Sequence, residues 1–166
     1  MSGYAAGSHY QNGGGGSNQL CLHDEPQWGN VPDTGNDTSW PPSGWLYGIK
    51  YRNNEGSSTY DKPAPCAVCY VSQRTASLVI PARTSCPVDW TLEYTGYLMS
   101  EESLSLNETI RHCTDYICVD DAPEAAAAGS ANPDQAFIFS VKVGCGSLPC
   151  SKYHDGWEVA CIVCTK

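Results

Sequence analysis

The sequence predicts an all-β fold in which disulfides staple a small antiparallel sheet. The chain has 166 residues, of which 41% are hydrophobic, so it can bury a compact core. Its 16 Gly and 11 Pro favour turns over long helices. Its ten cysteines are an even number, at a density typical of oxidising compartments, where disulfides supplement a limited core.

Segments rich in aromatic and β-branched residues mark the expected strands. They are LYGIKY (46–51), AFIFSVKV (136–143) and WEVACIVC (157–164). Polar loops rich in Gly, Pro and Asn, such as residues 32–45, separate them. The helical candidate is APEAAAAGSA (122–131), which is short for a helix that must be stable by itself.

The composition and motifs argue against several classes of function. Nine basic and eighteen acidic residues give a net charge of −9, which disfavours binding to nucleic acid or to an anionic membrane surface. Every apolar run is far shorter than the roughly 20 residues of a transmembrane helix. The sequence contains no phosphate-binding loop, no dinucleotide-binding fingerprint and no Gly-x-Ser-x-Gly motif. We therefore expect neither an enzyme nor a cofactor.

The chain repeats itself at a nearly constant spacing. Three motifs recur: SGY (2–4) as TGY (95–97), LCLHDEP (20–26) as ICVDDAP (117–123), and PCAVC (65–69) as ACIVC (160–164). The three offsets are 93, 97 and 95 residues. We therefore predict a tandem duplication, with repeats 1–75 and 76–166 packed as one compact domain.

The first repeat is the shorter of the two. The second repeat opens with LVIPARTSCPVDWTLEYTGY (78–97), and the first repeat, which begins at Ser2, has no counterpart to the opening strand and cysteine of this stretch. The start of the chain, MSGYAAGSHY, has neither the charge nor the apolar run of a signal peptide. We expect the chain to be a truncated form of a secreted protein.

The two C-x-x-C pairs can form a zinc site, a redox site or anchor points for disulfides. In a strand, residues i and i+3 point to opposite faces, so each pair can anchor two separate bridges. The intervening residues, Ala67-Val68 and Ile162-Val163, favour a strand over the tight turn of a zinc site. A redox pair needs a helix after it, and ACIVCTK ends two residues later. We therefore favour structural disulfides.

Several motifs together resemble a known family. CPVDWTLEYTGY, the lone cysteine of ICVDD, CGSLPC and ACIVCTK look like the C-terminal noncollagenous domain of the short-chain (spongin-type) collagens of invertebrates. The likeness covers nearly the whole chain and extends, more distantly, to the duplicated C-terminal domain of type IV collagen. It implies a fold like that domain and a secreted structural module of the extracellular matrix. The expected partner is a further copy of the chain, together with other matrix proteins or glycans.

The resemblance also implies a disulfide scheme. Its four bridges are Cys21–Cys66, Cys86–Cys164, Cys118–Cys161 and Cys145–Cys150. Cys69 and Cys113 remain, and they can pair with each other within one chain or between chains. The missing strand would expose a sheet edge, to which a neighbouring subunit can add a strand. Head-to-tail repetition of that contact would build a filament.

The alternative function is a secreted carbohydrate-binding, lectin-like protein. Aromatic residues among Gly, Asn and Asp can stack on sugars or act as core or interface anchors; these are Trp28, Trp40, Trp45 and Tyr47. N-glycosylation sequons at Asn36 and Asn107 agree with secretion. The acidic groups His23-Asp24-Glu25 and Asp120-Asp121 fit solvated turns better than a calcium site, so we expect no metal site.

Overall fold

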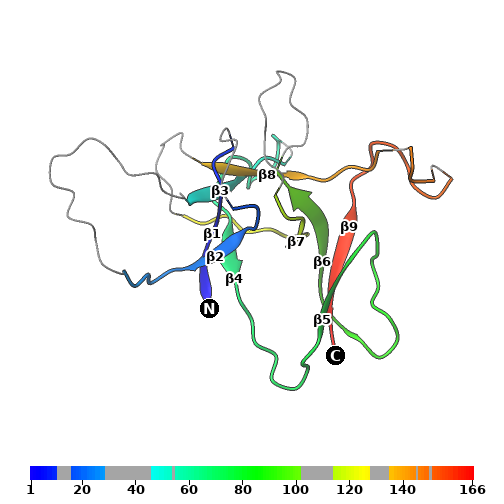
Figure 1. Cartoon of the computed structure of the whole chain (residues 1–166), viewed down its shortest axis with the longest axis horizontal. Coiled ribbons are helices and arrows are strands. Elements are labelled where there is room, and N and C mark those ends of the chain that lie inside the picture. The colour runs from blue at the N-terminus through cyan, green and yellow to red at the C-terminus, as the bar shows by residue number, and fades with distance from the viewer. Residues whose placement is uncertain are drawn as a thin grey trace.

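The computed structural model describes residues 1–10, 16–28, 46–53, 55–101, 114–127, 135–144, 146–149 and 151–166. These residues form nine strands and no helix, so the all-β prediction is confirmed for them (Figure 1). The strands are β1 (Ser2–Gly7), β2 (Leu20–His23), β3 (Tyr47–Tyr51), β4 (Pro65–Ala67), β5 (Ser77–Pro81), β6 (Thr91–Ser100), β7 (Ile117–Asp120), β8 (Ala136–Ser140) and β9 (Ala160–Thr165).

All nine strands belong to one curled, mixed sheet. Its path runs β2-β1-β3-β8-β6-β9-β5, with β4 paired to β1 and β7 paired to β6. The β3–β8 pair is parallel, and the other pairs of these strands are antiparallel. In Figure 1 the parallel pair lies at the top of the sheet, with β1, β2 and β4 below it on one side and β5, β6 and β9 on the other. The expected antiparallel arrangement therefore has one parallel exception.

The neighbouring strands of β1 and those of β6 have the same arrangement. β1 has β2 on one side and β4 followed by β3 on the other, because Gly3 pairs with β2 and β4 at once. β6 has β7 on one side and β9 followed by β8 on the other, because Gly96 pairs with β7 and β9 at once. We refer to β1 with β2, β3 and β4, and to β6 with β7, β8 and β9, as the two groups of strands. The pairing of β4 differs from that of β9. β9 has β5 as a second partner, whereas β4 has no second partner strand among the described residues.

Glycine in β1 and in β6 allows the sheet to curl tightly. A Cβ atom at Gly3 would lie 1.7 Å from the carbonyl oxygen of Leu22, and one at Gly96 would lie 1.8 Å from that of Val119. No side chain tolerates such a contact, so β2 and β7 can fold over the centre strands only because these positions carry none. The glycines are those of the SGY and TGY motifs.

The hydrophobic core lies where β3 and β8 meet β6. Alternate residues of β3, Ile49 and Tyr51, point into it, as the two-residue period of a strand requires. The buried members of this cluster are Ile49, Tyr51, Ala64, Met99, Ala136 and Ile138. Residues from both groups of strands therefore share one core.

The segments expected from the sequence differ from the strands at their ends. The strand expected over 136–143 ends at Ser140. Beyond it, Lys142 forms an isolated bridge with Glu158, and the Val143 N–H donates to the Trp157 carbonyl oxygen at 2.9 Å. The helix expected over 122–131 is wrong for residues 122–127, which are described and not helical. There the Ala126 N–H donates to the Pro63 carbonyl oxygen at 3.0 Å, so contact with a distant segment replaces the local bond of a helix. Residues 128–131 lie outside the described residues.

Replacing Gly96 by Ala should destabilise the fold, because a methyl group there pushes β7 away from β6. We expect the free energy of unfolding to fall by about 1–3 kcal/mol, as for other overpacked sites, measured by chemical denaturation. Gly48→Ala in β3 is the matched control, since nothing lies within 4 Å of a Cβ at that position. Equal stability of the two variants would contradict the close approach of β7 to β6.

Candidate functional site

Three disulfides occur among the described residues. They are Cys21–Cys66, Cys86–Cys164 and Cys118–Cys161, which are three of the pairings that the resemblance implies. The cysteines of ACIVC therefore bond to two different partners, and their sulfurs are not available to a metal ion. The remaining expected bridge, Cys145–Cys150, lies outside the described residues, as do Cys113 and the sequon residues Asn36 and Asn107.

Two of the bridges hold the curl of the sheet. Cys21–Cys66 joins the strands on either side of β1, and Cys118–Cys161 joins those on either side of β6. Their Cα atoms are 5.7 Å and 5.8 Å apart. In a flat sheet, strands separated by a third strand lie about 9.5 Å apart. Each bridge therefore fixes its two outer strands around a glycine-bearing centre strand.

The acidic groups after β2 and β7 tie the turns to these centre strands. The Ser2 hydroxyl donates to an Asp24 carboxylate oxygen at 2.7 Å, and the Thr95 hydroxyl donates to Asp121 at 2.6 Å. The hydrogen bond from Ser2 lowers the pKa of Asp24, and the charge of the neighbouring His23 adds to the effect. Asp24 and Asp121 therefore have the same structural role at corresponding positions of the two groups of strands.

β9 is covered by a strand on each of its two edges. β6 lies on one edge and β5 on the other, where Leu78 is opposite Cys164. Cys164 is fully buried and bonded to Cys86, which lies between β5 and β6. The bridge spans 78 residues, and in the chain-entropy model it stabilises the fold by about 4 kcal/mol.

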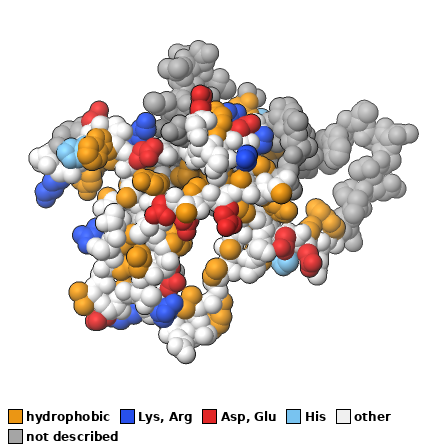
Figure 2. Space-filling view, turned by 180° about the vertical axis from the view of Figure 1, so that it is seen from behind, with side chains coloured by type: hydrophobic (Ala, Val, Ile, Leu, Met, Phe, Trp, Pro, Cys, Tyr) orange, Lys and Arg blue, Asp and Glu red, His pale blue; other side chains and the backbone are white. Residues whose placement is uncertain are grey.

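Among the described residues, no strand pairs with β4 on the edge that β5 covers in β9, and we call this the open edge. Cys69, which matches Cys164 in the sequence repeat, is a free, exposed thiol. Its neighbours are also exposed, Val68 by 55% and Tyr70 by 89%. Figure 2 shows that hydrophobic side chains are exposed at several places on the face of the molecule opposite to that of Figure 1. The segment that follows β4 therefore carries exposed apolar side chains next to the open edge.

The hydrogen bonds of β4 identify the backbone groups on this edge. The Val68 N–H donates to the Met1 carbonyl oxygen at 2.8 Å, and the Met1 amino group donates to the Val68 carbonyl oxygen at 3.0 Å. In an antiparallel pair, bonded and non-bonded residues alternate, so Ala67 and Cys69 present their backbone groups to the open side. Residues 63–73 carry no charged side chain that would repel a second strand.

Arg74 anchors the segment that follows the open edge. Its Nε donates to the Thr165 hydroxyl at 2.7 Å, and its guanidinium also donates to Glu93 at 2.8 Å. The Thr165 hydroxyl in turn donates to Glu93. This last hydrogen bond lowers the pKa of Glu93, and the charge of Arg74 adds to the effect. The segment after Cys69 is therefore fixed at its far end to β6 and β9.

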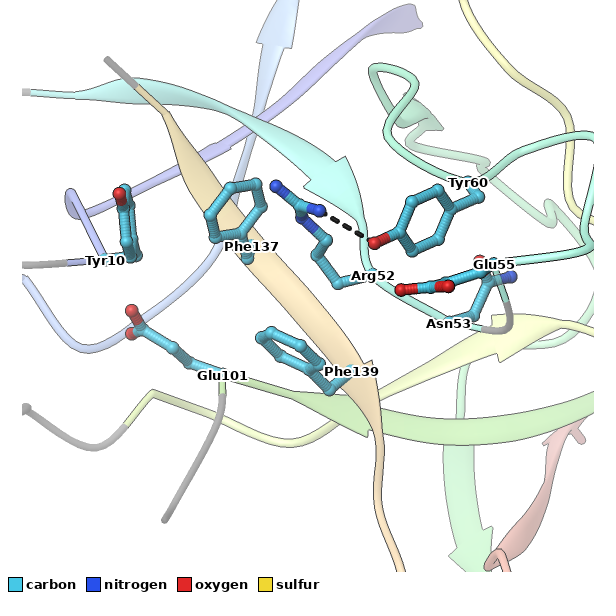
Figure 3. A pocket seen from close by; sticks show the side chains of 8 residues that line it. All are labelled: Tyr10, Arg52, Asn53, Glu55, Tyr60, Glu101, Phe137 and Phe139. Carbon is cyan, nitrogen blue, oxygen red and sulfur yellow. Dashed lines mark hydrogen bonds between the residues drawn. The ribbon is translucent and has the colours of Figure 1, made fainter. Parts of the chain in front are cut away.

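A second candidate site is a pocket of about 320 Å³ next to β8 and the segment that follows β3. Its centre is Arg52, whose guanidinium carbon lies 4.2 Å from the ring centre of Phe137 and which donates to the Tyr60 hydroxyl at 2.8 Å (Figure 3). The pocket is lined by Tyr10, Arg52, Asn53, Glu55, Tyr60, Glu101, Phe137 and Phe139. Aromatic faces next to polar groups suit a small polar ligand such as a sugar.

Of the aromatic residues singled out from the sequence, the two that the structure describes, Trp28 and Tyr47, do not line this pocket. Trp28 is 82% exposed on the segment after β2, and Tyr47 contacts His9 with ring centres 4.9 Å apart. Trp40 and Trp45 lie outside the described residues. The lining residues were missed because they come from separate segments, which no local motif connects. Another exposed aromatic, Trp157, packs against His154 with ring centres 4.4 Å apart.

Alkylation of the native, unreduced protein should modify Cys69, because its thiol is free and exposed. We expect iodoacetamide to label the Cys69 peptide completely and the Cys164 peptide only after reduction, as measured by peptide mass mapping. Cys69→Ser is the control for assignment of the label. A Cys69 peptide that is alkylated only after reductant is added would show that Cys69 forms a disulfide, which would contradict a free thiol.

The three disulfides fit a protein of an oxidising compartment such as the secretory pathway. Within the described ranges, no helix is long and apolar enough to cross a membrane. No protein-family model matches the sequence, and no solved structure matches the fold.

Proposed function

We propose that this chain is a secreted structural module of the extracellular matrix, which assembles into oligomers or filaments by accepting a strand from a neighbouring subunit. The observation that carries the proposal is the difference between β4 and β9. β9 is covered by β5 and closed by Cys86–Cys164, while β4 has no second partner strand among the described residues and is followed by the free Cys69.

The proposal includes a tandem duplication of the repeats 1–75 and 76–166. The matching neighbours of β1 and β6 support it, as do the glycines at the same register position. The bridges Cys21–Cys66 and Cys118–Cys161, each beside a hydroxyl–carboxylate pair, give further support. On this interpretation β5 is an element of the second repeat with no counterpart among the described residues of the first.

The disulfide pattern supports a relationship with the C-terminal noncollagenous domain of short-chain collagens and, more distantly, with that of type IV collagen. Three bridges implied by that resemblance occur among the described residues. Such a relationship agrees with a role in matrix assembly, with the chain itself and other matrix proteins or glycans as partners.

The open edge has the properties of an acceptor for a strand. Unpaired backbone groups on an edge bind an added strand by main-chain hydrogen bonds, and alternate side chains supply specificity. Addition of a strand would also cover Val68 and Tyr70, whose apolar surface is exposed to water. The net charge of −9 opposes the approach of further copies, so assembly should strengthen as salt screens it.

Analytical ultracentrifugation tests the proposal. The wild-type protein should form species larger than the monomer as its concentration and the salt concentration rise. Ala67→Pro should reduce this assembly, because proline removes an N–H from the open edge and none from the β1–β4 pair.

Ala67→Ser, which keeps the N–H, is the control and should assemble like the wild type. A wild-type protein that remains monomeric at the highest concentration and salt would contradict the proposal.

The alternative is a secreted carbohydrate-binding, lectin-like protein, and the pocket around Arg52 favours it. Tyr10 packs on Phe137 with ring centres 4.7 Å apart and forms part of the pocket wall. If the alternative holds, calorimetry should detect saturable binding of a glycan that Tyr10→Ala removes without changing the assembly state. Under the assembly proposal, Tyr10→Ala and the wild type should show the same oligomers and no such binding at this pocket.

A further inference from the structure

We propose that a pocket beside the start of β9 binds a short acidic saccharide, whose sugar ring carries a carboxylate or a sulfate group. Trp157 stacks on the ring, and Arg83 and Lys152 bind the anionic group. The inference rests on the proposed function in that a glycan is one of its expected partners. The pocket shares no residue with the open edge of β4 or with the pocket around Arg52.

The pocket is formed by segments that lie next to β9. Its volume is about 620 Å³, which is in the range of pockets that hold small ligands. Residues 82–85, which follow β5, and residues between β8 and β9 line it together with Ala160. In Figure 1 the segments after β5 and after β8 both lie on the right-hand side of the molecule. Its central side chains are Arg83, Lys152, His154, Trp157 and Glu158.

Residues 82–85 are held against β9 near both of their ends. The Ala82 N–H donates to the Ala160 carbonyl oxygen at 2.7 Å. The next residue after the segment is Cys86, which is bonded to Cys164 of β9. The backbone that carries Arg83 is therefore fixed relative to the rest of the pocket, so a ligand need not order it.

The backbone at Trp157 is fixed in a similar way. The Val143 N–H donates to the Trp157 carbonyl oxygen at 2.9 Å, and the Gly156 N–H donates to the Val143 carbonyl oxygen at 2.8 Å. Gly156 has a φ of 77°, a conformation that glycine adopts without strain. These bonds continue the antiparallel pairing of Lys142 with Glu158 and hold Trp157 at the pocket.

Trp157 has the properties of a surface on which a sugar ring stacks. It lines the pocket and is 65% exposed, so much of its apolar surface is in contact with water. The His154 ring supports it, with ring centres 4.4 Å apart and planes inclined by 39°. The apolar face of a sugar ring would cover part of the indole and remove that surface from water.

Arg83 and Lys152 are available to an anionic ligand. Among the described residues neither forms an ion pair, whereas Arg74, for example, is paired with Glu93. The Arg83 guanidinium donates to the Ser85 hydroxyl at 3.3 Å, which is a neutral partner. Guanidinium and ammonium groups bind oxyanions by charge-assisted hydrogen bonds. The two side chains can therefore bind a carboxylate or a sulfate.

Glu158 is the acidic residue among the described lining residues, and it has a cation beside it. It lies opposite Lys142 in the bridge, and residues opposite each other carry side chains on the same face of a sheet. The described lining residues thus have two cations and one carboxylate, whereas the whole chain has nine basic and eighteen acidic residues. Protonation of His154 adds a further positive charge. The pocket is therefore electropositive on an acidic molecule.

A short saccharide fits this combination better than a peptide or a long polyanion. An acidic peptide made of Asp or Glu supplies charge but no ring for Trp157, which would remain exposed. A long polyanion such as a nucleic acid strand would extend beyond the pocket and be repelled by the net charge of −9. An acidic sugar matches both the indole and the cations.

NMR titration of the isotopically labelled full chain with three tetrasaccharides tests the proposal. The heparin tetrasaccharide carries sulfates and carboxylates, the hyaluronan tetrasaccharide carries carboxylates, and chitotetraose is uncharged. At least one acidic saccharide should shift the amide signals of residues 82–85 and 152–158 saturably. Its Kd should be at least roughly tenfold lower than that of chitotetraose, a difference of about 1.4 kcal/mol. Binding of hyaluronan identifies the carboxylate as sufficient, and binding of heparin alone identifies the sulfate.

Two variants with matched controls locate the site. The double variant Arg83→Gln/Lys152→Gln should weaken binding at least roughly tenfold, because two charge-assisted contacts are lost. Lys62→Gln, which changes an exposed lysine outside the pocket, should bind as the wild type does. Trp157→Ala should weaken binding about tenfold, and Trp28→Ala, which changes a tryptophan outside the pocket, should not. Circular dichroism checks that each variant keeps the fold.

Equal affinity for the acidic and the neutral saccharides would overturn the proposal, as would unchanged binding by Trp157→Ala or by the double variant. A hexaglutamate peptide that binds the pocket as tightly as the acidic saccharide would also overturn it, because recognition would then depend on charge alone. Sedimentation separates these failures from that of the proposed function. If the protein assembles but binds no acidic saccharide, only the present inference fails; if it binds the saccharide and remains monomeric, only the assembly proposal fails.

Discussion

The close passage of the outer strands over Gly3 and Gly96 is the constraint on which the rest of the structure depends. The two outer strands of each centre strand are bridged at Cα separations of 5.7 Å and 5.8 Å, which a flat sheet does not permit. The centre strand can have no side chain at that point. Glycine, disulfide and curl therefore form a single unit, which occurs once around β1 and once around β6.

This unit determines which edges are available for further pairing. The centre strand covers one edge of β4 and of β9, so a further strand can add only at the other edge. β4 is held in place by Cys21–Cys66 and by Ala64, the residue before it, which is buried in the core and whose N–H donates to the Ile49 carbonyl oxygen. The open edge is thus pre-organised, and an incoming strand would not have to order its acceptor.

The sequence anticipated those features that depend on local patterns or on repeated motifs. Aromatic and β-branched segments gave the positions of β3 and β9, and the recurrence of SGY as TGY marked the two glycines. The parallel pairing of β3 with β8 could not be foreseen, because neither strand carries a local signal for a partner so far along the chain. The pocket around Arg52 could not be predicted for the same reason, because its lining residues come from separate segments of the chain. The helix predicted over residues 122–131 is wrong for residues 122–127. There the Ala126 N–H donates to the Pro63 carbonyl oxygen and not to a carbonyl oxygen of its own segment.

The most direct measurement is residue-resolved amide hydrogen exchange at low and at high protein concentration. The account predicts that the Ala67 and Cys69 amides exchange fast in the dilute protein, while the matching Ile162 and Cys164 amides, which face β5, are protected. At high concentration, Ala67 and Cys69 should become protected as a strand covers the edge. Protection of Ala67 and Cys69 that is already complete in the dilute monomer, or absent at every concentration, would contradict the claim that β4 is an open acceptor for a strand.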